Sequence, residues 1–205
     1  WVRIFLNPLC PKWINNRQIL GGYGYCDEFP VEHFYRDVLI YTIHEDTTGI
    51  QGMDLLGRKM MMKKGKAGQL YLTEVRKTIK DAQEDVGLKS YSEALEKALQ
   101  KLEKITAHLF GIASKGDPEM FLADATLYLE LFGIIAIAWQ WLKQAVIAKK
   151  MLNDGKLTEA DNNFYNGKIY TCRYFFGYEL PKIEGLAMRL SNGDDLTVNI
   201  KNEYF

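Results

Sequence analysis

The sequence is poor in the residues that build metal sites and disulfide frameworks. It holds 3 cysteines and 3 histidines among 205 residues, and neither set shows metal-ligand spacing. We therefore expect no bound metal. An odd cysteine count also argues against a disulfide framework, and it favours a reducing, cytoplasmic compartment.

Net charge is absent as well, because 26 basic residues balance 26 acidic ones. Partners such as nucleic acids and acidic membrane surfaces select for a basic excess, so we expect neither. The most apolar stretch, 131–139, is shorter than the roughly 20 residues that span a bilayer. It predicts a buried core helix and no membrane insertion. Residues 1–6 include Arg3 and lack the long apolar core of a signal peptide.

Strand signals are scarce, whereas apolar residues recur at helical spacing along most of the chain. We expect helices over 30–43, 50–60, 72–79, 90–112, 118–153 and 158–176, with Pro181 bending or ending the last. The last four of these helices, joined by short connections, predict an all-α fold: an up-and-down antiparallel bundle resembling a four-helix bundle.

Several local signals delimit these helices. Ser90-x-x-Glu93 has the spacing of a capping box, and Asp117-Pro118 is typical of a helix start. Thr158 predicts the start of the last helix, and Gly155 the end of the helix before it. Residues 63–68 read as a linker, and 196–205 as a lone extended arm.

Residues 18–51 contain the strongest candidates for functional residues. Gly21-Gly22 lets a backbone approach a ligand closely, and a helix start near Thr47 or Thr48 favours an anion. Glu45 lies between two predicted helices, where partial desolvation would raise its pKa into the range of a useful base. A tight turn and an exposed loop acid explain the same residues without any function.

Four short segments carry a family resemblance in this stretch. In order they read Q-I-L-G-G-Y-G-Y (18–25), E-F-P-V-E (28–32), R-D (36–37) and E-D-T-T-G-I-Q (45–51). This ordered set resembles the C-terminal signature of the acyl-CoA dehydrogenases. Residues 123–181 look like the extra C-terminal helical domain of one bacterial branch. The resemblance implies that 1–65 end the dehydrogenase C-terminal domain and that 66–205 form an additional bundle.

The resemblance also implies an activity. Members of this family oxidise an acyl-CoA thioester to the trans-2-enoyl-CoA, with FAD as cofactor, and Glu45 aligns with the base that removes the α-proton. Asp46, directly after the base, is expected to lie against the substrate. The positions expected to contact FAD are Gln18, Ile19, Leu20, Gly21, Gly22, Thr47, Thr48 and Gly49. The implied partners are the acyl-CoA, an electron-transfer flavoprotein as acceptor, and further copies of the chain in a dimer or tetramer.

The sequence departs from the family pattern beside the base. Asp46 stands where the family has Gly, and His44 where it has Tyr. A carboxylate next to Glu45 disfavours ionisation of the base. A non-catalytic oligomerisation or interaction module derived from the family is therefore the alternative, and a free-standing helical protein with chance similarity is the third reading. The family's N-terminal helical domain and middle β-domain are not recognisable here, so we expect a piece of a longer enzyme that binds flavin poorly alone.

Overall fold

The computed structural model describes residues 19–40, 47–153, 155 and 157–204. These residues contain helices and turns and no β-strand, which confirms the predicted all-α class. The α-helices are α3 (Val31–Leu39), α4 (Thr48–Met53), α5 (Met62–Gln83), α6 (Lys89–Ser114), α7 (Pro118–Leu122), α8 (Ala125–Asn153), α9 (Glu159–Tyr174) and α10 (Ile183–Asn192). The 3-10 and π-helical turns are η2 (Gly21–Tyr25), η4 (Asp54–Lys59), η5 (Phe175–Glu179), η6 (Leu180–Lys182) and η7 (Asn202–Tyr204).

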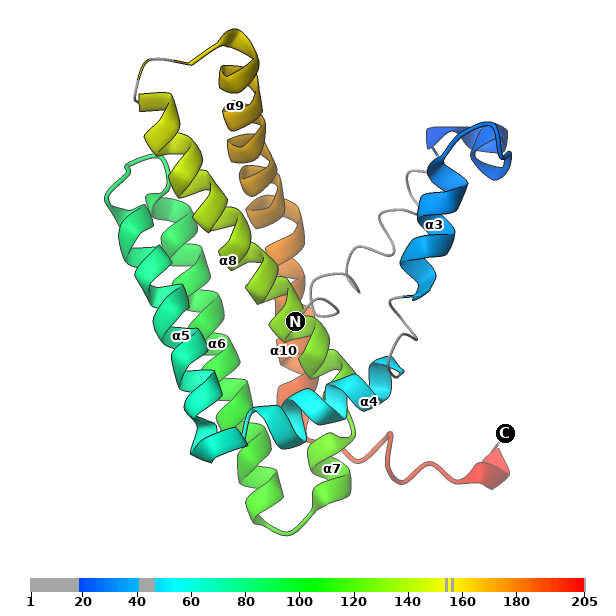
Figure 1. The fold of residues 1–205 in the computed structure, drawn as a ribbon. Helices are drawn as coiled ribbons and strands as arrows, with labels where there is room; N and C mark the ends of the chain where they lie inside the picture. Colours follow the sequence, from blue (N-terminus) through cyan, green and yellow to red (C-terminus); the bar gives the residue numbers. More distant parts are fainter. Residues whose placement is uncertain (1–18, 41–46, 154, 156, 205) are drawn as a thin grey trace.

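The bundle is built around α8. Helices α5, α6 and α9–α10 run alongside it, and α4 crosses the end of the bundle where α8 begins (Figure 1). Tyr128, Leu131, Ile135 and Leu142 of α8 are completely buried. A helix that is apolar on all sides needs neighbours on all sides, and α8 has them. The prediction of a buried core helix is confirmed. By length and composition, 118–153 could also cross a membrane, although 61% of its most apolar 18-residue window is buried inside the structure.

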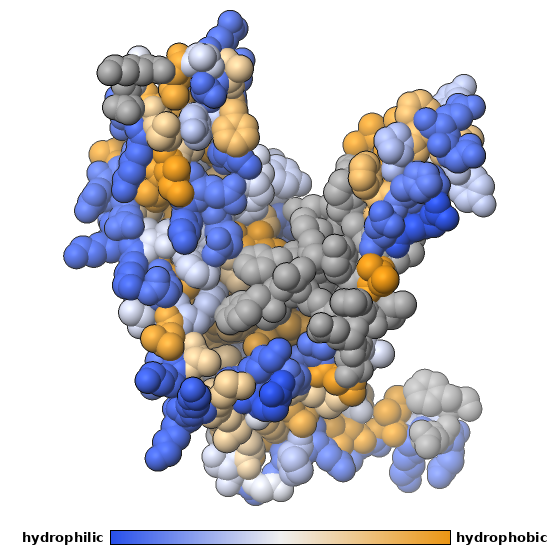
Figure 2. All heavy atoms as spheres, viewed as in Figure 1, coloured by the Kyte–Doolittle hydropathy of each residue, from blue (hydrophilic) through white to orange (hydrophobic). Residues whose placement is uncertain are grey.

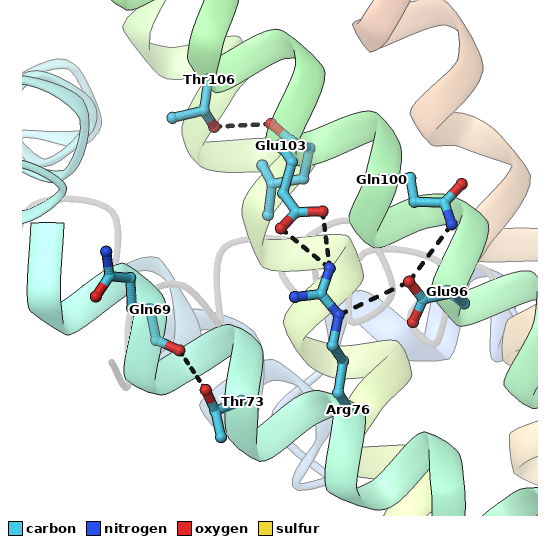
Figure 3. Close-up of polar contacts among 8 residues, drawn as sticks. Gln69, Thr73, Arg76, Glu96, Gln100, Glu103 and Thr106 are labelled. Carbon is cyan, nitrogen blue, oxygen red and sulfur yellow. Dashed lines mark hydrogen bonds and ion pairs between the residues drawn. The ribbon is translucent and has the colours of Figure 1, made fainter.

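Helices α5 and α6 are joined across their exposed seam by an ion-pair cluster (Figure 3). Arg76 of α5 donates hydrogen bonds of 3.0 and 2.9 Å to the two carboxylate oxygens of Glu103 on α6. Its Nε also lies 3.8 Å from Glu96. These side chains are partly exposed, so the cluster adds modestly to a contact that Val75, Leu99 and other buried residues dominate.

Two of the predicted helix starts are confirmed. The Asp117 side chain accepts a hydrogen bond of 2.9 Å from the Met120 N–H, with Pro118 in the first turn. Thr158 forms a complete capping box with Asp161 at the start of α9. Both caps satisfy backbone N–H groups that the first helical turn leaves without partners.

The capping box predicted at Ser90 is wrong. Helix α6 begins at Lys89, with Leu88 at the cap position and no side-chain cap. Leu88 is completely buried, and burial of this residue fixes the start of the helix earlier than the polar pattern indicates. The turn before it is instead closed by Asp85, whose carboxylate accepts a hydrogen bond of 2.8 Å from the Gly87 N–H.

Two long helices are less regular than their sequence pattern. A turn at 123–124 separates α7 from α8, where one helix was expected. After α9, the chain passes Pro181 through the π-helical turn η5 and the 3-10 turn η6 before α10 begins. Proline has no N–H to donate, and the changed hydrogen-bond pattern accommodates it, so Pro181 bends the path without ending it.

The predicted linker at 63–68 is narrower than expected. Only Lys63, Lys64 and Gly65 leave helical geometry, with φ of 50°, 58° and 79°. The chain turns there from η4 into the long part of α5. The tail does not form an extended strand in its described part. Asp195 accepts hydrogen bonds from the N–H groups of Val198 and Asn199, and η7 follows.

The segment 19–40, here called the arm, differs from the bundle. It consists of η2 and α3, which pack on each other and project away from the bundle (Figure 1). Apolar side chains lie among charged ones on its surface (Figure 2). The large exposed apolar residues of the arm are Ile19, Tyr23, Tyr25, Phe29, Phe34 and Ile40. As predicted for a helix over 30–43, α3 begins directly after Pro30.

Candidate functional site

The predicted site residues fall into two groups on different elements. Ile19, Leu20, Gly21 and Gly22 begin the arm, and Thr47, Thr48 and Gly49 begin α4. Gln18, Glu45 and Asp46 lie outside the described residues. The glycine strip lies at η2, at the end of the arm far from α4 (Figure 1), so the structure does not bring the two described groups into one pocket.

The glycine strip presents an accessible backbone. Gly21 has a φ of +57°, a conformation that favours glycine, and it opens the 3-10 turn η2. A Cβ built at Gly21 or Gly22 meets nothing within 4 Å, and Ile19 beside them is 82% exposed. The described residues therefore leave this backbone uncovered, which is compatible with the cofactor contact that the resemblance implies.

Thr47 fixes the first residue of α4. Its backbone is extended, with φ of −74° and ψ of 159°, and its hydroxyl accepts a hydrogen bond of 3.5 Å from the Ile50 N–H. Thr48 and Gly49 form the first turn and are half-buried. A side-chain cap defines where a helix starts, so Thr47 sets the beginning of α4.

The next turns anchor α4 in the bundle. Gly52 is buried, and a Cβ on it would lie 2.7 Å from the carbonyl oxygen of Ala125, the first residue of α8. Leu55 and Leu56 of η4 then enter the main hydrophobic core. The sequence reading did not single out Gly52. A glycine inside a helix lowers the helix stability by about 1 kcal/mol relative to alanine. A glycine within a helical pattern can therefore indicate a position where two backbones meet, as Gly52 and Ala125 do.

An ion-pair cluster flanks the same segment. Asp54 accepts hydrogen bonds from Arg58 and lies 3.0 Å from Lys59. The hydrogen bond from Arg58 is the main reason that the pKa of Asp54 falls to about 2; partial burial opposes this shift, and Lys59 adds to it. The carboxylate thus stays ionised on the outer face of η4 and holds the turn in helical geometry.

Other hollows lie elsewhere on the bundle. A groove of about 710 Å³ between α6 and α9–η5 is lined by aromatic residues, including Tyr91 and Tyr174, with Arg173 beside them. A smaller hollow of about 240 Å³ lies between α5, α6 and α8. Neither includes Thr47, Thr48 or Gly49. Among the described residues, no group of three His, Cys, Asp or Glu side chains could hold a metal ion.

Comparisons with known families match both parts of the chain. Residues 13–61 match the family described as "Acyl-CoA dehydrogenase, C-terminal domain". Residues 71–201 match the family described as "Acetyl-CoA dehydrogenase C-terminal like". The second match alone covers more than half of the chain.

Individual relatives agree with the family matches. The chain is 29% identical over 217 residues to a butyryl-CoA dehydrogenase of Syntrophomonas wolfei, covering 96% of this chain and 33% of that protein. It is 31% identical over 187 residues to the 3-methylmercaptopropionyl-CoA dehydrogenase of Ruegeria pomeroyi, covering 87% of this chain and 30% of the relative.

A shorter match, 45% identical over 58 residues, is to the caffeyl-CoA reductase-Etf complex subunit CarC of Acetobacterium woodii; it covers 28% of this chain and 14% of that one. The chain spans about a third of the length of the long curated relatives it matches. These matches, with the ordered motif over 18–51, show that the chain belongs to the acyl-CoA dehydrogenase family and comprises its C-terminal domain region followed by the C-terminal extension.

Proposed function

We propose that this chain is the C-terminal part of an FAD-dependent acyl-CoA dehydrogenase and that Glu45 is its catalytic base. The observation that carries the proposal is the start of α4. Thr47 caps this helix two residues after Glu45, and Gly52 anchors the same helix in the bundle. The proposed base therefore precedes a helix whose first residue and whose packing against α8 are both defined. A reaction that depends on the relative placement of the reacting groups requires such a fixed support.

In this proposal, Glu45 removes the α-proton of the acyl-CoA thioester. Its backbone N–H polarises the thioester carbonyl, which acidifies that proton. Asp46 lies against the substrate. When bound, FAD supplies the acceptor for the β-hydride. The chain's part is to hold the carboxylate on the face of the Cα–Cβ bond opposite the flavin, and the fixed start of α4 supports this role.

The separation of the two predicted contact groups supports a role in an oligomer. Thr47, Thr48 and Gly49 follow the base directly and would contact the flavin of their own active site. Gln18, Ile19, Leu20, Gly21 and Gly22 belong to or adjoin the arm that projects from the bundle, and they would reach a flavin held by another subunit. A homodimer or tetramer satisfies both sets of contacts, whereas a lone chain does not.

We further propose that the division between the two parts lies at residues 65 and 66. The reversal at Lys63, Lys64 and Gly65 supports this boundary, because α5 runs into the bundle from there. The remaining two thirds of the enzyme would hold most of the flavin and the acyl pocket, so the isolated chain would bind FAD weakly. An electron-transfer flavoprotein in the cytoplasm would reoxidise the flavin.

The alternative is a non-catalytic oligomerisation or interaction module derived from the family. Asp46 favours it, because a second carboxylate beside Glu45 opposes ionisation of the base. Under this alternative the enzyme retains flavin but does not reduce it with any acyl-CoA.

The test is the visible spectrum of the complete flavoprotein during titration with acyl-CoAs of several chain lengths. We expect bleaching by at least one of them and loss of bleaching in Glu45→Gln. A matched control is Glu74→Gln, which removes an exposed acid of α5 and should bleach normally. Bound flavin that no acyl-CoA reduces, and that Asp46→Gly makes reducible, would instead establish the non-catalytic alternative.

A further inference from the structure

The start of α8 is held from the far end of the chain. Arg189 of α10 lies 3.0 Å from the carboxylate of Asp124, at the turn directly before α8. The same guanidinium donates a hydrogen bond of 2.6 Å to Asp194, just beyond α10. The Arg189 and Asp124 side chains are 26% and 21% exposed, so solvent screens this pair less than it screens the surface pairs of the bundle.

The second acid of this cluster is itself fixed. Asp194 also accepts a hydrogen bond of 2.6 Å from the Asn192 side chain and one of 3.2 Å from the Leu196 N–H. Gly193 between them adopts a φ of +67° and ends α10. Arg189 thus joins a preorganised loop at the end of α10 to the turn that begins α8.

This turn is also the seat of α4. Gly52 packs against the carbonyl of Ala125, the residue that follows Asp124. Backbone against backbone leaves no side chain to absorb a displacement, so a shift of the α7–α8 turn is transmitted to α4. Gly52 lies seven residues after Glu45, and the Thr47 cap makes the intervening segment helical from Thr48 on.

We propose that the Arg189–Asp124 ion pair is a positioning device for the base: the extension holds the α7–α8 turn, and the turn seats the helix that Glu45 precedes. Arg189 and Asp124 are positioning residues, because they act through α4 and do not contact the reacting atoms. This inference rests on the proposed function, and it assigns the C-terminal extension a part in turnover. Displacing a reacting group by about 1 Å can cost up to about 100-fold in rate, so a loosened seat should appear in kcat.

The experiment compares Arg189→Gln with Arg76→Gln in the complete enzyme. Both substitutions remove a guanidinium that joins two segments of the bundle, but Arg76 bridges α5 and α6 through Glu96 and Glu103 (Figure 3) and pairs with no described residue of α4 or of the α7–α8 turn. We expect Arg189→Gln to lower kcat about 10-fold while KM and flavin affinity change less than about 2-fold. Arg76→Gln should leave kcat unchanged at a similar loss of thermal stability. Arg189→Lys keeps the charge but not the fork that spans two carboxylates, and it should fall between.

Hydrogen exchange at the amides of α4 in the substrate-free enzyme supplies a readout that does not need turnover. Arg189→Gln should speed exchange over 50–53, Asp124→Asn should do the same, and Arg76→Gln should not. Wild-type kcat in Arg189→Gln, an equal loss in Arg76→Gln, or unchanged exchange in α4 would each overturn the proposal. Persistent bleaching in Glu45→Gln would instead defeat the proposed function, and the exchange result would still decide whether Arg189 seats α4.

Discussion

The bundle and the arm differ in how far their apolar side chains are buried. In the bundle, α5, α6, α8 and α10 enclose a continuous core in which Tyr128, Leu131 and Ile135 are completely buried. In the arm, Phe34 is 48% exposed and Tyr25 is 83% exposed, although α3 has one apolar and one charged face. Exposed apolar patches of this kind mark contact sites.

The difference suggests what each part is for. The bundle's helical pattern is satisfied by the bundle itself, so its fold follows from its own sequence. The arm is amphipathic but projects from the described bundle (Figure 1). Under the proposed function, the surface that covers its apolar face would belong to another part of the enzyme or to another subunit. Stability should therefore reside in the bundle, and the arm should contribute to association.

The largest expected effect separates the two regions by stability. Phe132 is 2% exposed in the middle of α8 and packs against Tyr71, with ring centroids 4.8 Å apart. Phe132→Ala should lower the free energy of unfolding by about 3–5 kcal/mol. Phe34→Ala in the arm should lower it by less than about 0.5 kcal/mol. Urea unfolding of both variants measures this difference, and equal losses would contradict the division of roles.

The joint between α4 and the bundle gives the next effect. Gly52→Leu places a side chain where the Ala125 backbone lies, and it should destabilise the chain by about 2 kcal/mol. Gly111→Ala in α6 is the opposite case, because a Cβ there meets nothing within 4 Å. It should stabilise by about 0.5–1 kcal/mol, since alanine favours a helix over glycine. Thermal melts of both variants would show shifts of opposite sign; a neutral Gly52→Leu would show that α4 is not seated on α8.

A smaller effect tests the helix starts of the bundle. Thr158→Ala removes the hydroxyl that accepts a hydrogen bond from the Asp161 N–H at the start of α9, and it should cost about 1 kcal/mol. The reciprocal hydrogen bond from the Thr158 N–H to the Asp161 carboxylate is kept. Ser90→Ala should be nearly neutral, because Ser90 lies inside α6 and does not cap it. If chemical denaturation ranked the two variants the other way, the assigned start of α6 would be wrong.

The smallest effect is a dependence on pH. Asp54 has a pKa of about 2 in the folded chain, below the ordinary value of 3.8, because Arg58 donates hydrogen bonds to it. A lowered pKa stabilises the fold above about pH 4, and this contribution is lost as pH falls from about 4 toward 2. Asp54→Asn should therefore melt slightly below wild type at pH 7 and at the same temperature near pH 2. A gap that persists at pH 2 would mean that packing, not charge, explains the loss.

Local signals predicted much of the fold. The continuous apolar run over 131–139 identified the buried helix, and polar caps identified the starts at Asp117 and Thr158. The errors came where tertiary packing outweighs local pattern. Burial of Leu88 moved the start of α6, and the turn at 123–124 lies where Arg189 binds Asp124, a contact between residues far apart in sequence.

The aromatic residues of the last helices show the same limit. Aromatic residues at helical spacing are typical of core positions, and Phe175 and Phe176 are buried in the core. Tyr170, Tyr174 and Tyr178 are more than half exposed instead, on the face that turns outward along α9 and η5. The spacing of these residues does not reveal the π-helical turn η5. That turn changes the number of residues per helical turn, and it therefore changes which of the rings point toward the bundle.

The candidate site depended on a motif more than on periodicity. Residues 18–51 carry the family signature in order, so the sequence indicated which residues to examine. It did not indicate Gly52 or Arg189, because neither carries reaction chemistry. Their roles follow from a backbone contact and an ion pair that only the folded chain brings together.

The most direct test of the central claim is exchange of the α-protons of a bound acyl-CoA in deuterium oxide, followed by NMR in the complete flavoprotein. Exchange reports removal of the α-proton, the step assigned to Glu45. The account predicts exchange in the wild-type enzyme and a loss of at least about 100-fold in Glu45→Gln, in line with the usual contribution of a general base. Undiminished exchange in Glu45→Gln would contradict the account and place the base elsewhere.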